Sequence, residues 1–308
     1  MTTYDEVYIY FDTNKIEARN GKRLFLSDIS VKNEYFDIEN FIQEQKLTSK
    51  VHLCIPEVVW KELAEHMRKD YKSSVQSLKQ RISDEKKMFG SLLDADLVFK
   101  LEDDKKSYEE YIGEIQEEFL NNPKITASII PYPKEPEVMD SLLEKATHSD
   151  SPFSTAKNNK KEYSDAGFKD ALIFETFVRH TGQSSMGILY TNDRDFDEAL
   201  DKVESNGNLR CIYEFDELKK VLMDNFQIVD ADIVAQKVAN NQYLYEQIFA
   251  ELQIPSPQNT VYEGISNIEE SDEGISLVLT LRLDGELAKF NLIYDVNANE
   301  LVSVDIDN

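Results

Sequence analysis

Short apolar runs that alternate with helix-like segments most constrain how this chain can fold. The strand-like runs, rich in Val, Ile, Leu, Tyr and Phe, occupy residues 5–11, 51–55, 187–191 and 209–213. The helix-like segments between and after them occupy residues 56–82, 165–181, 194–204 and 214–223. This alternation predicts an α/β fold with a doubly wound parallel sheet.

A long insertion interrupts this pattern after the second strand. A charged, largely helical stretch continues to about residue 121, and residues 122–164 contain five prolines and one short helix near 136–147. Such a long irregular stretch inside a compact domain is usually functional or mobile. We therefore expect one domain over residues 1–224, with an insertion at about 66–164.

The last part of the chain, residues 225–308, has a different character. One helix is expected at about 230–252, and four strand-like runs follow at 260–268, 274–283, 287–295 and 300–306. The pair Asp284-Gly285 is a strong hairpin signal. These features predict a small antiparallel α+β module. It holds 15 Asp or Glu against Lys237, Arg282 and Lys289, a net charge of −12.

Composition excludes several classes of protein. The net charge of −25 argues against a diffusely basic nucleic-acid binder, so a polyanion would have to meet local basic clusters in residues 1–224. No apolar run approaches the ~20 residues that span a bilayer, and the acidic N-terminus does not resemble a signal peptide. Cys54 and Cys211 both lie in apolar runs, which favours buried thiols and a cytoplasmic protein.

Acidic residues stand where buried strands end. Asp12 follows the first apolar run, Asp193 follows the run at 187–191, and Asp170 lies early on a helix between them. A carboxylate at such a position costs desolvation energy unless it is paired or holds a metal. The carboxyl ends of parallel strands meet at one edge of a sheet. The pattern therefore predicts a divalent-cation site and a metal-dependent hydrolase.

A further acid comes from the helix after the second strand, where Glu57 and Glu62 are both candidates. They are five residues apart, about 140° around a helix, so they do not share a face. The helix dipole favours any acid in the first turn, which accounts for Glu57. We therefore favour Glu62 and leave Glu57 open as the alternative.

Four motifs in this order resemble the PIN domain family of metal-dependent nucleases: IYFDTN, IPEVVWKEL, GFKDALI and LYTNDRDF. The resemblance covers residues 5–224 and is strongest to larger members with a helical insertion and a GFKDA-type motif. It implies a PIN-like three-layer fold and a catalytic Mg²⁺ or Mn²⁺ site formed by Asp12, Glu62, Asp170 and Asp193, with Asp195 as a fifth metal ligand. Hard cations of this kind prefer carboxylate oxygens.

Substrate-binding candidates surround these acids. Asn14 and Thr191 are candidates to orient a metal-bound water or the backbone, and Arg194 is a candidate to pair with an acid or contact a phosphate. The cluster expected to hold phosphates beside Asp170 consists of Lys157, Lys160, Lys161 and Lys169. The bases of the helical insertion alternate with acids, which favours a solvated helix face. The histidines show no ligand spacing, so we expect structural or surface roles for all of them.

The resulting expectation is a PIN-type endoribonuclease, with RNA favoured over DNA as substrate. One alternative is a structure-selective DNA nuclease, and another is a catalytically silent scaffold that binds a protein partner through the acidic tail. The family's frequent use as toxins or phage-defence effectors adds a further hypothesis. The sequence leaves a homo-oligomer open and indicates no membrane association.

Overall fold

The computed structural model describes residues 3–21, 23–90, 107–148, 167–203, 207–228, 231–271, 274–295, 298 and 300–306. The chain divides into two compact units, Met1–Val221 and Leu222–Asn308. No helix within the described ranges is long and apolar enough to cross a membrane.

The first unit is built on a five-stranded parallel sheet. Its strands are β1 (Val7–Phe11), β2 (Val51–Pro56), β3 (Ser128–Ile130), β4 (Met186–Tyr190) and β5 (Leu209–Ile212). They lie in the order β3-β2-β1-β4-β5, and every neighbouring pair is parallel. All five residues of β4 are buried, as expected for a central strand covered on both faces. The predicted parallel α/β sheet is thus confirmed.

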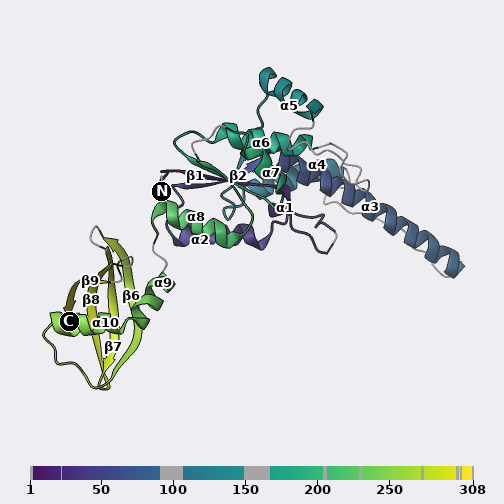
Figure 1. Ribbon diagram of the computed structural model, residues 1–308. Coiled ribbons are helices and arrows are strands. Elements are labelled where there is room, and N and C mark those ends of the chain that lie inside the picture. The colour runs from purple at the N-terminus through teal and green to yellow at the C-terminus, as the bar shows by residue number, and fades with distance from the viewer. Residues whose placement is uncertain are drawn as a thin grey trace. The chain divides into compact units, whose positions relative to one another are not determined.

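Helices cover the two faces of this sheet, and Figure 1 shows α6 on one side with α2 and α8 on the other. Their bounds are α1 (Thr13–Ile16), α2 (Asn33–Glu44), α3 (Glu57–Phe89), α4 (Tyr108–Leu120), α5 (Pro136–His148), α6 (Phe168–His180), α7 (Asp195–Leu200) and α8 (Phe215–Phe226).

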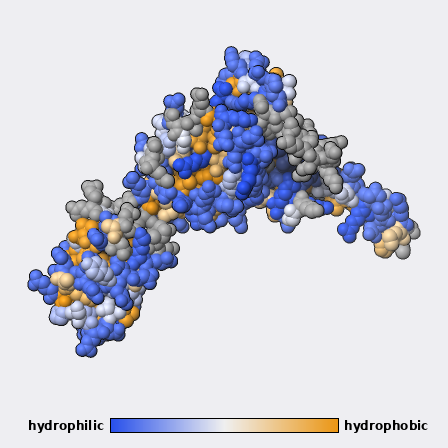
Figure 2. Space-filling view, in the orientation of Figure 1, coloured by the Kyte–Doolittle hydropathy of each residue, from blue (hydrophilic) through white to orange (hydrophobic). Residues whose placement is uncertain are grey.

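Helix α3 is 33 residues long and continues well past the sheet (Figure 1). Its buried residues all lie in its first eleven positions, from Val58 to Met67. At its far end Met88 and Phe89 are 81% and 51% exposed. Figure 2 shows a patch of pale orange, hydrophobic surface at the far end of this helix. Only the first third of the helix therefore belongs to the core of the unit.

Three elements of the first unit, α1, α2 and β3, were not anticipated from the sequence. Helix α2 lies in a stretch for which we expected no element, although it buries Tyr35, Ile38 and Ile42 at helical spacing. Strand β3 lies in the stretch expected to be irregular. It has only three residues and pairs only with β2, so it leaves no periodic signal of its own.

The second unit contains a four-stranded antiparallel sheet, and its described residues also form two helices. Figure 1 shows these helices beside the sheet. The strands are β6 (Thr260–Ser271), β7 (Gly274–Leu283), β8 (Glu286–Asp295) and β9 (Glu300–Ile306), in that order across the sheet. Asp284 and Gly285 both have positive φ, at 48° and 98°, which fits a tight hairpin turn between β7 and β8. The predicted antiparallel module is confirmed.

The single helix expected at about 230–252 is wrong, because two helices occupy that stretch. They are α9 (Ala231–Asn240) and α10 (Gln242–Glu251). Asn241 leaves helical geometry between them, and its side-chain oxygen accepts a hydrogen bond from the Leu244 amide at 3.0 Å. Asparagine is a favoured N-cap residue, so one local hydrogen bond starts the second helix. Both helices pack on one face of the sheet, against Leu279 and Phe290 among others.

Candidate functional site

A polar hollow of about 510 Å³ collects residues from several elements of the first unit. Asp12 follows β1, Glu62 lies on α3, Asp170 lies on α6, and Asp193 follows β4. The full lining is Asp12, Thr13, Asn14, Glu17, Arg19, Lys32, Glu62, His66, Asp170 and Asp193. The four acids singled out as catalytic from the sequence therefore lie around one hollow.

Asp12 is fixed in orientation by three donors. One carboxylate oxygen accepts from the Thr13 amide at 2.6 Å and caps α1. The other accepts from the Asn14 side-chain amide at 2.5 Å and from the Thr191 hydroxyl at 2.6 Å. The main chain also holds Asp12 beside β4, because its amide donates to the Tyr190 carbonyl at 3.1 Å.

The environment of Asp12 disfavours its charged form. The side chain is 5% exposed. The pKa of Asp12 is raised to about 6, chiefly because the carboxyl group is buried; the hydrogen bonds from Thr191 and Thr13 act against the rise, and the negative charges of Glu62 and Asp193 add to it. A bound cation would remove this conflict, because it would neutralise the carboxylate that burial destabilises.

Glu62 lies opposite Asp12 and shares a partner with it. Its carboxylate accepts from the Thr13 hydroxyl at 2.6 Å and from the Lys169 ammonium at 2.9 Å. Glu57 does not line the hollow; it pairs with Lys61 at 2.7 Å, and this partner lowers the pKa of Glu57. The two glutamates thus differ in surroundings: Glu62 belongs to the hollow and Glu57 does not.

The segment after β4 forms a compact turn. Thr191 is fully buried; its hydroxyl donates to Asp12 and accepts from the Asp193 amide at 3.0 Å. The Asn14 side-chain oxygen accepts from the Asn192 amide at 3.0 Å. Asn14 and Thr191 therefore tie the end of β1 to the end of β4.

Two other candidates, Asp195 and Arg194, are not among the residues that line the hollow. Asp195 begins α7. Its amide donates to the Asp193 carboxylate at 2.9 Å, and burial followed by the charge of Asp193 raises the pKa of Asp195. The Arg194 guanidinium lies over the Tyr213 ring, 5.4 Å from its centre.

The expected phosphate-binding lysines are only partly described. Lys157, Lys160 and Lys161 lie outside the described residues. Lys169, beside Asp170 on α6, forms an ion pair with Glu62 at 2.9 Å. In this arrangement its charge is directed at a candidate metal ligand.

Five lining residues were missed by the sequence interpretation: Thr13, Glu17, Arg19, Lys32 and His66. His66 was expected to be structural or on the surface. It contacts Glu17 at 2.6 Å and Glu62 at 3.7 Å. Its spacing from Glu62 could have indicated this, because residues four positions apart on a helix lie on the same face. Glu17, Arg19 and Lys32 lie between helices in a stretch without hydrophobic periodicity.

The candidate metal ligands in the hollow are carboxylates, which suit a hard divalent cation. Among the described residues, however, no group of three or more His, Cys, Asp or Glu side chains converges as a ready metal cage. Asp12 faces three hydrogen-bond donors, and Glu62 faces Thr13 and Lys169. The carboxylates therefore suit a divalent metal ion in their chemistry and their location. A bound ion would replace some of the hydrogen-bond donors that now contact Asp12 and Glu62.

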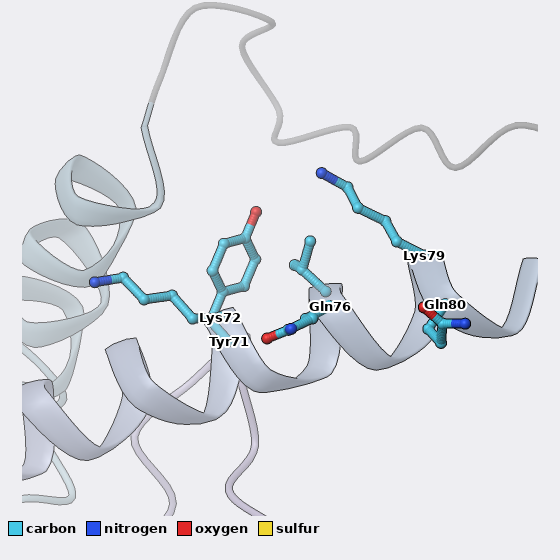
Figure 3. Close-up of a pocket in the computed structure, with 6 residues that line it drawn as sticks. Tyr71, Lys72, Gln76, Lys79 and Gln80 are labelled. Carbon is cyan, nitrogen blue, oxygen red and sulfur yellow. The ribbon is translucent and has the colours of Figure 1, made fainter. Parts of the chain in front are cut away.

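A second hollow, of about 450 Å³, lies on α3, and none of the described residues that line it has a carboxylate. Figure 3 shows Tyr71 and Lys79 on the same side of this helix. Several bases of the helix are already paired: Arg68 with Glu109 and Lys87 with Asp84. These ion pairs agree with the expectation of a solvated helix face.

Comparison with known proteins assigns the first unit to a family. The model of the PIN domain family matches residues 9–196, which is more than half of the chain. This chain belongs to the PIN domain family. Members of this family are generally nucleases and typically use divalent metal ions. No curated protein and no solved structure gives a significant match.

Proposed function

We propose that this protein is a metal-dependent endoribonuclease whose catalytic carboxylates are Asp12, Glu62, Asp170 and Asp193. The observation that carries the proposal is their meeting around one hollow, although they come from positions up to 181 residues apart in the chain. Their carboxylate oxygens are the ligand atoms that Mg²⁺ and Mn²⁺ prefer. Asp195 is proposed as an outer acid that positions Asp193 through its amide hydrogen bond.

A bound Mg²⁺ or Mn²⁺ supplies Lewis acidity and lowers the pKa of a bound water. The chain's own residues hold the carboxylates in place. Thr191 and Asn14 hold Asp12, and Thr13 holds Glu62. In the metal-free chain, the Lys169 ammonium offsets the charge of Glu62, which limits repulsion among the acids.

The test compares the full-length protein with three variants on labelled single-stranded RNA and DNA, with Mn²⁺, Mg²⁺ or EDTA. We expect metal-dependent cleavage of RNA and a loss of at least about 100-fold in Asp12→Asn and Glu62→Gln. Glu57→Gln is the matched control, because it removes an acid from the same helix outside the hollow. We expect it to retain cleavage.

Other outcomes identify the alternatives. Faster cleavage of DNA would replace the ribonuclease by a DNA nuclease, because the phosphodiester chemistry is common to both. If the native protein and the Asp12→Asn variant cleave at the same rate, the cleavage comes from a contaminating nuclease. That result would leave the silent scaffold that binds a protein partner through residues 225–308.

A further inference from the structure

Two cations of one short segment lie at the acidic hollow. Arg19 and Lys32 both line it, and they stand near the two ends of the chain segment that connects α1 to α2. Five carboxylates share this lining, including Glu17 beside Arg19. A phosphate approaching these acids meets repulsion unless cations accompany it. Arg19 and Lys32 are placed to supply that charge.

The described residues of the connecting segment, 17–21 and 23–32, are held in place at the base of the segment and farther along it. At the base, the Ala18 amide donates to the Ser30 carbonyl, and the Lys32 amide donates to the Ile16 carbonyl, both at 3.0 Å. Farther along, the Leu24 amide donates to the Asp70 carboxylate on α3 at 2.9 Å.

Helix α4 also holds the segment. The Tyr108 hydroxyl donates to the Leu26 carbonyl at 3.0 Å, and Leu24 and Ile29 pack on a core shared by α3 and α4. These contacts fix the backbone that carries Arg19 and Lys32, so their positions at the hollow are pre-organised.

Both cations have donors that the protein leaves available. The Lys32 ammonium donates to the Asn14 carbonyl at 2.5 Å, and among the described residues it forms no ion pair with a carboxylate. Arg19 directs Nε and Nη2 at Glu17, both at 2.5 Å, and Nη2 also lies 3.5 Å from His66 Nδ1, while its Nη1 has no partner in the described part of the chain. An ammonium has three donors and a guanidinium five, so each side chain can donate an additional hydrogen bond to a phosphate oxygen.

The composition of the segment agrees with this role. It holds Arg19, Lys22, Arg23 and Lys32 against Glu17 and Asp28, a net charge of +2 in a chain of −25. It also presents Phe25 with 43% of its surface exposed. Basic side chains together with an exposed aromatic ring are the features that bind single-stranded nucleic acid through phosphates and base stacking.

We propose that Arg19 and Lys32 each bind one backbone phosphate of a single-stranded nucleic acid and so position it over the acidic hollow. This inference rests on the proposed nuclease function and names the substrate class of that same site. The two residues act as positioning residues, and Phe25 offers a surface on which a base stacks.

The test measures binding without catalysis. A labelled single-stranded RNA is titrated with metal-free, full-length protein while fluorescence anisotropy is recorded over a range of salt concentrations. The double variant Arg19→Gln/Lys32→Gln is compared with Lys202→Gln/Lys219→Gln, which makes the same change in net charge. The control lysines are ion-paired with Glu198 and Asp216 and lie outside the hollow.

We expect the Arg19→Gln/Lys32→Gln variant to bind about tenfold more weakly, with the slope of log K against log salt reduced by about 1.4, since each phosphate contact on a single strand contributes about 0.7. The control should bind as the native protein does. Arg19→Lys/Lys32→Arg keeps both charges and should restore most of the affinity. Melting temperatures of all variants would show that each is folded.

Four results would overturn the proposal: no binding by the native protein at low salt, an unchanged slope in the Gln variant, an equal loss in the control, or equal affinity for a duplex of the same sequence. Absence of metal-dependent cleavage with the expected binding pattern would instead remove the nuclease function and leave the phosphate-binding residues in place. The two failures are thereby distinguishable.

Discussion

At the scale of single residues, Asp12 links the stability of the first unit to pH. Its pKa is about 6 in the folded protein against 3.8 for an ordinary aspartate, so between these values the folded state binds more protons than the unfolded state. The contribution of Asp12 to the free energy of unfolding therefore falls as pH rises from about 4 to 6. Above pH 6 this loss of stability remains constant. At pH 7 it amounts to roughly 3 kcal/mol.

The Asp12→Asn variant has no carboxylate to ionise at this position and should escape this loss. We expect its stability relative to the native protein to rise across the same pH window, as measured by urea unfolding in EDTA at pH 4, 5, 6 and 7. Parallel stability curves for the two proteins would contradict the prediction. Saturating Mn²⁺ should shrink the difference at pH 7, because ligand binding stabilises the native state by mass action.

The sequence allowed the acidic residues of the site to be predicted better than its basic ones. Asp12 and Asp193 come directly after strands whose apolar runs are readable, so their place at the sheet edge follows from the topology. Arg19 and Lys32 come from a segment whose path depends on tertiary contacts, such as the bond from the Leu24 amide to Asp70. No local pattern encodes such a path.

At the scale of elements, the break between α9 and α10 is the clearest place where one side chain decides the secondary structure. The apolar pattern runs through residues 230–252 and favours one helix. Asn241 interrupts it because its side chain caps the Leu244 amide and also hydrogen-bonds Tyr294, which is fully buried. Periodicity alone does not distinguish a continuous helix from two capped ones.

We expect Asn241→Ala to destabilise the second unit by about 1–2 kcal/mol, since it removes an N-cap and leaves the Tyr294 hydroxyl without this partner. Asn240→Ala is the matched control, because Asn240 is exposed and, within the described ranges, its side chain bonds only the Gln236 carbonyl, at 2.9 Å. Urea unfolding followed by circular dichroism would measure both. Equal stability of the two variants would contradict the role given to Asn241.

At the scale of the whole molecule, charge is distributed unevenly between the two units. Residues 227–308 have a net charge of −12, the same as residues 225–308, because Asn225 and Phe226 are uncharged. Segment 17–32 of the first unit, in contrast, is basic. Both sheets could be predicted because strand alternation and hairpin signals are properties of the sequence. The role of the acidic unit could not, because charge alone does not specify a partner.

A chain that ends at residue 226, the last residue of α8, should therefore bind single-stranded RNA at least as tightly as the full chain at low salt. The removed residues repel a polyanion, and salt weakens this repulsion as the screening length shortens to about 10 Å at 0.1 M. Anisotropy titrations at low and high salt would measure the effect. Weaker binding by the shortened chain, with its circular dichroism spectrum intact, would show that the second unit helps to hold the substrate.

The order of strands in the parallel sheet also determines when the acidic hollow is completed during synthesis. β1 pairs with β4, whose residues are made more than 170 positions later, and Asp193 lies beyond β4. Contacts so distant in sequence form late in folding, because the loop between them must close first. A ribosome-bound chain shorter than 193 residues lacks Asp193, one of the four acids. Before β4 is made, it also lacks the strand that holds Asp12 in place. The growing polypeptide thus remains without a complete carboxylate set near the messenger from which it is translated.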